Sequence, residues 1–248
     1  MDLNADLGEG FGIWRLGDDE ALLDVITSAN VACGFHAGDP GTMRRICAMA
    51  AARDVAIGAQ VSYRDLAGFG RRRIDYDFGE LRDDILYQLA ALDGLARVAG
   101  ARVSYLKPHG ALYNVAAVDA VQAEAVVAAV AEYDFALPIL TLPDSELARQ
   151  ATRVGLRVIP EGFADRAYTA AGQLVPRSVP GAVLTSVDEI AARAVAMAHG
   201  SITAIDGAVV PVPVMSICVH GDTPGAVAIA RAVRVALSSA DIVVGRVV

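Results

Sequence analysis

The stretch Val103-Ser104-Tyr105-Leu106-Lys107-Pro108-His109-Gly110 joins a short apolar run to a polar turn that contains glycine. A run of this length, bounded by turn residues, predicts a buried strand over Val103 to Lys107. Similar runs recur along the chain at Leu3 to Asp6, Val25 to Cys33, Val55 to Gln60, Leu137 to Thr141, Arg157 to Pro160 and Val214 to Val219. The sequence therefore predicts about seven strands, most of which lead into a polar segment.

Helical patterns with recognisable ends separate most of these runs. Asp39-Pro40 offers an N-cap and a first-turn proline, and apolar residues repeat at helical spacing from about Phe78 to Ala99. A capping box opens a helix at Ser186 to Glu189, and Thr223-Pro224 opens the last one. Strand–helix alternation of this kind implies a parallel sheet. About seven units favour an irregular, closed or nearly closed β/α barrel over an open doubly wound sheet, built as one α/β domain over residues 1–248.

Two segments interrupt the alternation between strands and helices. Tyr168 to Arg177 and Ile202 to Val212 have the pattern of short hairpins, and the second of them turns at Asp206-Gly207. We therefore expect both segments to lie outside the main parallel sheet.

The composition of the chain argues against several classes of protein. With 21 basic and 29 acidic residues, a formal net charge of −8 argues against a nucleic-acid partner, because phosphate binding requires a basic face. No unbroken apolar run reaches membrane-spanning length, and residues 1–6 carry no signal pattern. Cys33, Cys47 and Cys218 lack CxxC spacing, which favours a reducing compartment over a zinc–cysteine site. We expect a cytoplasmic protein with no membrane partner.

Polar residues gather where the predicted strands end. The carboxyl ends of parallel strands meet at one edge of a β/α fold and bind its ligand there. Three of the four histidines belong to this set. Its members, in chain order, are Asn4, Asp6, Glu9, Asn30, His36, Asp39, Gln60, Ser62, Tyr63, Lys107, His109, Asn114, Glu161, Asp165, Arg166, His220 and Asp222.

Each of these residues also has a purely structural interpretation. Asp39 and Asp222 can cap helices, a lone histidine is often a hydrogen-bonded core group, and Glu9 can be a solvated loop carboxylate. Lys107 is harder to explain in this way, because it directly ends a strand. Gly68-Phe69-Gly70 precedes three arginines, which can hold an anion or form an ordinary charged surface. Separate structural roles do not explain so many chemically capable residues at one edge, so we predict an active site there.

Six stretches, in order along nearly the whole chain, resemble motifs of the LamB/YcsF family, the A subunits of bacterial ATP-dependent 5-oxoprolinase. They are Asp2–Gly12 (DLNADLGEGFG), Ser28–Pro40 (SANVACGFHAGDP), Lys107–Asn114 (KPHGALYN), Glu161–Tyr168 (EGFADRAY), Leu174–Ser178 (LVPRS) and Ser216–Pro224 (SICVHGDTP). The chain departs from the family at Gln60-Val61-Ser62-Tyr63, where relatives usually carry His-Pro-Ser-Tyr. Gln60 can form hydrogen bonds but does not titrate near neutral pH and is a weak ligand for transition metals.

The resemblance implies the irregular barrel of the glycoside hydrolase/deacetylase superfamily. It also implies opening of the lactam of 5-oxo-L-proline to L-glutamate with ATP hydrolysis, in a complex with 5-oxoprolinase subunits B and C. ATP would be the cofactor, although the chain has no GxxxxGK[ST] phosphate loop.

Residue chemistry then suggests roles for the residues at the strand ends. We expect the catalytic residues to be Asp6, Glu9, His36, Lys107, His109, Glu161, Arg166, His220 and Asp222. The residues expected to bind substrate are Asn4, Asn30, Gln60, Tyr63 and Asn114. A divalent cation such as magnesium, if one is bound, would be held by Asp6, His36 and His109.

Two other functions stay open at this point. A stand-alone metal-dependent deacetylase or amidohydrolase would bind its metal through Asp6, His36 and His109 and use His220 or Glu161 as the base. A noncatalytic carbohydrate-binding or regulatory subunit would need no base, and Gln60 is compatible with that function. The sequence also leaves open whether the chain forms a homo-oligomer.

Overall fold

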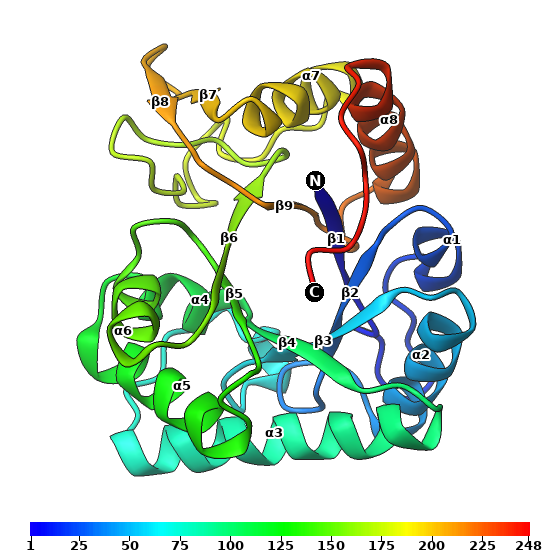
Figure 1. Ribbon diagram of the computed structural model, residues 1–248, viewed down its shortest axis with the longest axis vertical. Coiled ribbons are helices and arrows are strands. Elements are labelled where there is room, and N and C mark those ends of the chain that lie inside the picture. The colour runs from blue at the N-terminus through cyan, green and yellow to red at the C-terminus, as the bar shows by residue number, and fades with distance from the viewer.

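The computed structural model describes residues 1–248 and contains a closed barrel of seven parallel strands (Figure 1). The order around the barrel is β1-β2-β3-β4-β5-β6-β9, and β9 closes it by pairing with both β6 and β1. The predicted irregular barrel of about seven parallel strands is therefore confirmed. The strands are β1 (Asp2–Leu7), β2 (Ser28–Ala32), β3 (Ala56–Val61), β4 (Val103–Pro108), β5 (Ile139–Thr141), β6 (Val158–Phe163) and β9 (Ser216–Val219).

The interior of the barrel is polar, which is visible in the alternation of residues along β1. Leu3 and Leu7 belong to the main hydrophobic core, whereas Asn4 and Asp6 form hydrogen bonds with side chains of other barrel strands. Successive side chains of a strand point to opposite faces. The apolar set thus packs under the helices and the polar set fills the barrel, so both faces of β1 are buried.

Eight α-helices surround the barrel (Figure 1). Several begin as the sequence predicts: Asp39 accepts hydrogen bonds from the amides of Gly41 and Thr42, and Ser186 accepts one from the amide of Glu189. No single helix is both long and apolar enough to cross a membrane; only α4 and α5 reach that composition together, and they are bent by 108°. The helices are α1 (Asp19–Leu23), α2 (Pro40–Ala52), α3 (Phe78–Val98), α4 (Gly110–Ala116), α5 (Ala120–Tyr133), α6 (Glu146–Val154), α7 (Val187–Ala198) and α8 (Ala226–Ser239).

The segment between β6 and β9 departs from the strand–helix repeat. Strands β7 (Ser201–Thr203) and β8 (Val209–Pro211) form an antiparallel pair outside the barrel, which confirms the hairpin predicted over residues 202–212. In the other predicted hairpin, Tyr168 and Leu174 form only an isolated antiparallel bridge. That segment is therefore mostly a loop.

The last residues of the chain cover the amino-terminal end of the barrel. The amino group of Met1 donates to the carbonyl of Val243 at 2.7 Å, and Arg157 donates to the carbonyl of Val247 at 2.6 Å. Val247 and Val248 pack against a small apolar cluster that includes Tyr105. Figure 1 shows the C-terminus lying over the centre of the barrel, close to the N-terminus. The opposite end, where the strands finish, is the end available to a ligand.

Deletion of Val247 and Val248 is expected to destabilise the protein without altering the opposite end of the barrel. The deletion uncovers apolar surface of the Tyr105 cluster, and we expect a loss of roughly 1–3 kcal/mol in the free energy of unfolding. Thermal denaturation should show a melting temperature lower by several degrees. The variant Val235→Ala, at a side chain that is 66% exposed on α8, serves as the control. An unchanged melting temperature in the truncated chain would contradict this role of the C-terminus.

Candidate active site

A cavity of about 620 Å³ opens at the carboxyl ends of the barrel strands. Asp6, Lys107, His109 and His220 line it from the barrel side, while residues 142–145 and 171–177 line it from surrounding loops. The structure therefore brings together residues from β1, β4 and β9 that are far apart in the sequence. This is the gathering that the strand-end pattern predicted.

Lys107, on β4, places its ammonium group inside the barrel. Its Nζ donates to Oε1 of Glu161 at 2.7 Å and to Oδ1 of Asp6 at 3.3 Å. It also lies 3.3 Å from Oδ1 of Asn4 and 3.2 Å from Sγ of Cys218. Burial by itself would lower the pKa of Lys107, but the facing Asp6, Cys218 and Glu161 outweigh it and raise that pKa well above its usual value. Lys107 is thus a fixed cation at the base of the cavity.

The two carboxyl groups beside Lys107 differ in their proton affinity. Burial favours the protonated form of Asp6, but the positive charge of Lys107, with smaller contributions from His220 and His109, holds the pKa of Asp6 well below its usual range. For Glu161 burial prevails over Lys107, and its pKa is raised. Asp6 is therefore the permanent counterion of Lys107, whereas Glu161 is the carboxyl group that can hold a proton.

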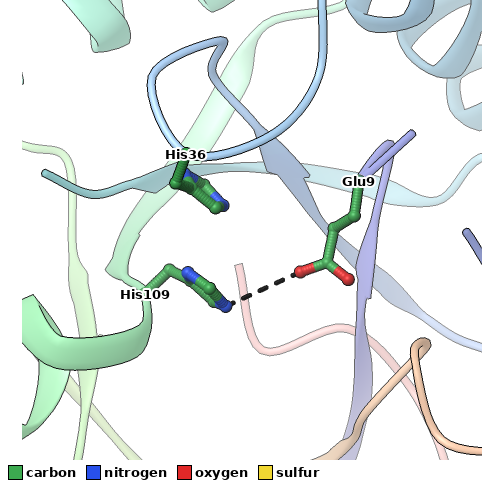
Figure 2. Close-up of side chains that lie close together, drawn as sticks. All are labelled: Glu9, His36 and His109. Carbon is green, nitrogen blue, oxygen red and sulfur yellow. Dashed lines mark ion pairs between the residues drawn. The ribbon is translucent and has the colours of Figure 1, made fainter. Parts of the chain in front are cut away.

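A second cluster consists of Glu9, His36 and His109, which extend from the loops after β1, β2 and β4 (Figure 2). One ligand atom from each lies within 4.8 Å of the others, and Nε2 of His109 is 3.7 Å from Oε1 of Glu9. The two imidazole rings stack with their centres 4.3 Å apart. The Nδ1 atoms of both histidines are buried and have no hydrogen-bond partner. Two imidazoles that have unsatisfied nitrogens and lie close to a carboxyl group mark a place where a ligand can bind.

Burial controls the protonation of this cluster. It lowers the pKa of His36 to about 4 and that of His109 well below its usual value. It also raises the pKa of Glu9 well above its usual value, assisted by the negative charges of Asp6 and Asp222. Both imidazoles are therefore neutral near pH 7, the state in which histidine binds a metal or accepts a proton.

The structure places Glu9 beside the two histidines in the position where the sequence suggested Asp6. Asp6 lies on β1 and is bonded to Lys107 and Asn30 inside the barrel, so it is not part of this cluster. The chain turns after β1 through Gly8, whose φ of 70° is a left-handed conformation, and this turn leads to Glu9. One carboxylate with two imidazoles suits zinc or another transition metal better than magnesium, which prefers oxygen ligands.

Gln60 joins His36 to Glu9. Its Oε1 is 3.2 Å from Nε2 of His36, and its Nε2 donates to Oε1 of Glu9 at 3.4 Å. The side chain is completely buried and lies outside the cavity wall. The structure thus places Gln60 between His36 and Glu9 and not in the cavity wall, and its role in substrate binding stays a prediction.

A loop that includes Phe69 and Gly70 holds the histidine pair from outside. The ring of Phe69 meets both imidazoles edge-on, with centres 6.0 Å from His36 and 5.3 Å from His109. Gly70 has a φ of 66°, and a Cβ there would lie only 2.9 Å from Cβ of His36. Glycine at this position therefore allows the loop to pack directly on the histidines.

His220 and Asp165 form a hydrogen-bonded pair at the cavity. Nδ1 of His220 is 2.7 Å from Oδ2 of Asp165, and the imidazole ring stacks on Phe163 with centres 5.4 Å apart. Although burial favours its protonated form, Asp165 has a lowered pKa, mainly because of His220. The carboxylate fixes the ring and leaves Nε2 for a ligand. Asp165 stood among the strand-end residues of the sequence, but nothing in its spacing indicated that it orients His220.

Asn4 and Asn30 lie below the cavity, inside the barrel. Both side chains are completely buried, and Nδ2 of Asn30 donates to Oδ1 of Asn4 at 2.7 Å. The remaining polar atoms bind other barrel residues, including the hydroxyl of Tyr105, which donates to Asn30 at 2.6 Å. The expected contact of these two residues with substrate is corrected to a supporting role, because neighbouring side chains already use their polar atoms.

Tyr63 also lies away from the cavity, whereas Asn114 lines it as expected. The hydroxyl of Tyr63 donates to the side chain of Gln122 on α5, and its ring stacks on Tyr76 with centres 5.6 Å apart. The expected role of Tyr63 in substrate binding is corrected to packing among the helices.

The arginines of the cavity wall were only partly anticipated. Arg166 lines the cavity as predicted, but Arg71 and Arg177 were not assigned to the site. Arg71 pairs with Asp222 at 2.6 Å, so Asp222 holds an arginine at the entrance. The Gly-Phe-Gly-Arg string is the only signal for Arg71 in the sequence, and such a string more often belongs to an ordinary charged surface.

The closed barrel of seven parallel strands is the fold expected of the family that the sequence motifs resemble. The sequence model of the LamB/YcsF family matches residues 1–247. The chain belongs to the LamB/YcsF family.

Relatives of this LamB/YcsF protein match it over nearly its whole length. A Mycolicibacterium gilvum protein named as the A subunit of 5-oxoprolinase is 60% identical over 235 residues, which cover 94% of this chain and 93% of that protein. A Streptomyces coelicolor protein of the same name is 59% identical over 246 residues, covering 99% and 98% of the two chains.

Solved structures agree with the barrel of this LamB/YcsF protein. The crystal structure of the lactam utilization protein from Thermus thermophilus has a TM-score of 0.94 at 42% identity and covers 98% of both chains. A family 4 carbohydrate esterase from Streptomyces lividans has a TM-score of 0.54 at 10% identity, covering all of this chain and 92% of the esterase. The second likeness concerns the fold alone and shows that the two chains share a barrel of the same kind.

Protonation of His36 is expected to make the LamB/YcsF chain less stable as the pH falls. The unfolded histidine titrates near 6.5 and the folded one at about 4, so the unfolded state binds more protons between these values. The stabilising contribution is complete above pH 6.5 and is lost as the pH falls to 4, by an amount of roughly 3 kcal/mol. Denaturant unfolding of chelator-treated protein at a series of pH values measures it.

The variant His36→Gln should show a shallower decline in stability between pH 6.5 and 4 than the wild type. His199→Gln is the matched control, since His199 is exposed at the end of α7. If the curves of His36→Gln and the wild type run parallel through this interval, His36 is not held neutral by its burial.

Proposed function

We propose that this LamB/YcsF protein is the A subunit of a cytoplasmic ATP-dependent 5-oxoprolinase, which opens the lactam of 5-oxo-L-proline to L-glutamate together with subunits B and C. The observation that carries the proposal is the 60% identity, over 94% of the chain, to a relative named as the A subunit of 5-oxoprolinase. The cavity adds chemical support, because it combines a fixed cation, Lys107, with a histidine, His220, that is bound to a carboxylate.

The reaction needs an activated amide, because a lactam carbonyl is a poor electrophile. Transfer of the γ-phosphoryl group of ATP to the lactam oxygen forms an O–P bond and releases ADP. Water then adds to the ring carbon and gives up a proton, and the C–N bond breaks as the nitrogen takes up a proton. A second water hydrolyses the resulting acyl phosphate to the carboxylate and inorganic phosphate, so that ATP and two waters are consumed for each ring opened.

The charged residues of the cavity match the needs of these steps. Lys107, held by Asp6, supplies positive charge for the oxygen that becomes anionic. His220, oriented by Asp165, takes the proton from water through Nε2. His220 can then return that proton to the departing nitrogen. Glu161 lies beneath the cavity and holds Lys107 in place at 2.7 Å. Because the chain lacks a phosphate loop, we assign ATP to a site completed by one of the two partner subunits.

Removal of the His220 imidazole is expected to stop turnover of the assembled enzyme. Coexpression of this chain with subunits B and C, followed by an assay of glutamate formed from 5-oxo-L-proline and ATP, measures it. We expect His220→Asn to lower kcat by about 10²–10⁴-fold, the usual contribution of a general base. His199→Asn, at an exposed histidine, should retain full turnover. Wild-type activity in His220→Asn would exclude the base, and equal activity of the isolated chain without ATP would exclude the proposed reaction.

A second candidate function, metal-dependent amide or ester hydrolysis, is favoured by one observation. Glu9, His36 and His109 offer one carboxylate and two neutral imidazoles within 4.8 Å of one another. These residues would hold a transition metal, which would act as a Lewis acid toward a bound carbonyl.

Zinc binding tests the metal proposal directly. Titration of chelator-treated chain with zinc should raise the melting temperature of the wild type, because a metal that binds only the folded state stabilises it. His109→Ala should abolish this rise, and His199→Ala should keep it, since His199 lies outside the cluster. Hydrolysis without ATP that depends on the metal would favour the second function. If zinc does not change the melting temperature, the metal proposal is rejected. Glu9, His36 and His109 would then serve only in substrate binding and proton transfer.

A further inference from the structure

We propose that Arg166 and Arg177 form an oxyanion subsite in the cavity wall, which binds a carboxylate or phosphate group of the ligand. The existence of the subsite follows from the charges of the cavity. The identity of its ligand rests on the proposed function, which offers the carboxylate of 5-oxo-L-proline and the phosphates of ATP.

Neither Arg166 nor Arg177 forms an ion pair with a carboxylate of the chain. Five cationic side chains line the cavity: Arg71, Arg73, Lys107, Arg166 and Arg177. Carboxylates pair with the first three, at 2.6 Å for Arg71, 2.9 Å for Arg73 and 2.7 Å for Lys107. No carboxylate oxygen forms such a pair, within 4.0 Å, with Arg166 or Arg177. The unbalanced positive charge of the cavity therefore lies on the segment after β6.

Arg166 is a buried charged residue. Its side chain belongs to the buried set, with 5% of the residue exposed, and it donates to the carbonyls of Val175 at 2.6 Å and Ala182 at 3.2 Å. Carbonyls accept its hydrogen bonds but do not neutralise its charge, and an unpaired buried charge is costly. A cation retained under these conditions is expected to meet an anion from outside the chain.

The positive charges of Arg166 and Arg177 repel each other. Burial and the charge of Arg177 together lower the pKa of Arg166 to about 10. Both arginines help to lower the pKa of Asp165, but its ion pair is with His220, at 2.7 Å, and not with either arginine. Two like charges that face one cavity, neither of them ion-paired with a carboxylate, are relieved by an oxyanion that bridges them.

Hydrogen bonds behind Arg166 fix the buried half of the subsite. Arg193, on α7, donates to the backbone carbonyls of Arg166 at 2.8 Å and Ala164 at 3.2 Å. The amide of Ala167 donates to the carbonyl of Ala182 at 2.9 Å, and the amide of Val175 donates to the carbonyl of Ala167 at 3.0 Å. Since the loop is fixed by these bonds, Arg166 is positioned before a ligand arrives.

The location of the subsite indicates which part of a ligand it binds. Arg166 and Arg177 lie in the loop region after β6, whereas Lys107 and His220 line the same cavity from the barrel strands. A cavity of about 620 Å³ has room for a group beyond the amide that reacts. The subsite therefore holds an anionic group of the ligand while the strand-end residues act on its amide.

Arg177→Ala is the sharper variant, because Arg177 is exposed and makes no hydrogen bond that the fold needs. Arg102→Ala is the matched control, since Arg102 is an exposed arginine just before β4, at the opposite end of the barrel. Calorimetric titration of the isolated chain would use 5-oxo-L-proline, 2-pyrrolidinone, which lacks the carboxylate, and inorganic pyrophosphate. Steady-state assays of the complex with subunits B and C would give separate Michaelis constants for the lactam substrate and for ATP.

Two results would support the subsite and identify its ligand. If the group is the carboxylate, Arg177→Ala weakens the binding of 5-oxo-L-proline at least tenfold, in its Kd or its Michaelis constant, and leaves 2-pyrrolidinone and ATP unchanged. If the group is a phosphate, the same variant weakens the binding of pyrophosphate or ATP at least tenfold and leaves 5-oxo-L-proline unchanged. Arg177→Lys, which keeps the charge, should recover part of either loss.

Other results would overturn the subsite. These are unchanged constants in Arg177→Ala, an equal change in Arg102→Ala, or no binding of any anionic probe by the wild type, alone or in the complex. The outcome is separable from that of the proposed function. Turnover of 5-oxo-L-proline with normal constants in Arg177→Ala would retain the function and reject the subsite. Anion binding that depends on Arg177, in a complex without 5-oxoprolinase activity, would retain the subsite and reject the proposed function.

Discussion

The ion pairs of Lys107 with Glu161 and Asp6 constrain most of this structure. The ammonium group lies in the barrel interior, 2% of the residue is exposed, and its nearest partner is 2.7 Å away. A buried lysine without such partners would be strongly destabilising, so β1, β4 and β6 must meet with these three side chains pointing inward. The closed barrel satisfies this requirement, because it turns one face of every strand toward a common axis.

Below Lys107, the polar side chains inside the barrel are hydrogen-bonded to one another. Asp2 accepts from Ser28 at 2.7 Å, and Asn30 donates to Asn4 and Asp6 at 2.7 and 2.8 Å. Such a network stabilises a single arrangement of strands only when its members are satisfied. The lower part of the barrel is thus structural, although it consists of the residue types that usually bind ligands.

Above Lys107, some buried polar atoms have no hydrogen-bond partner. This distinguishes the candidate site from the hydrogen-bonded network beneath it. The buried side-chain atoms without partners are Nδ1 of His36, Nδ1 of His109 and Oδ1 of Asp165, all from residues that follow barrel strands. Arg166 and Arg177 add two cations without a carboxylate partner in the same cavity. Neutral imidazoles and unpaired guanidinium groups suit a small anionic amide, and this agrees with the reaction proposed for the complex.

The sequence by itself determined the number of strands, their parallel direction and the end of the barrel where the chemistry gathers. It could do so because short apolar runs and strand-end turns are local features, and the carboxyl ends of parallel strands must meet. It also led to the LamB/YcsF family through long, contiguous motifs. Only the tertiary structure decided which neighbours share a contact: Glu9 rather than Asp6 beside the histidines, Asp165 behind His220, and Tyr63 among the helices. These pairings depend on loop paths and on the direction of each side chain, which arise from packing between segments far apart in the chain.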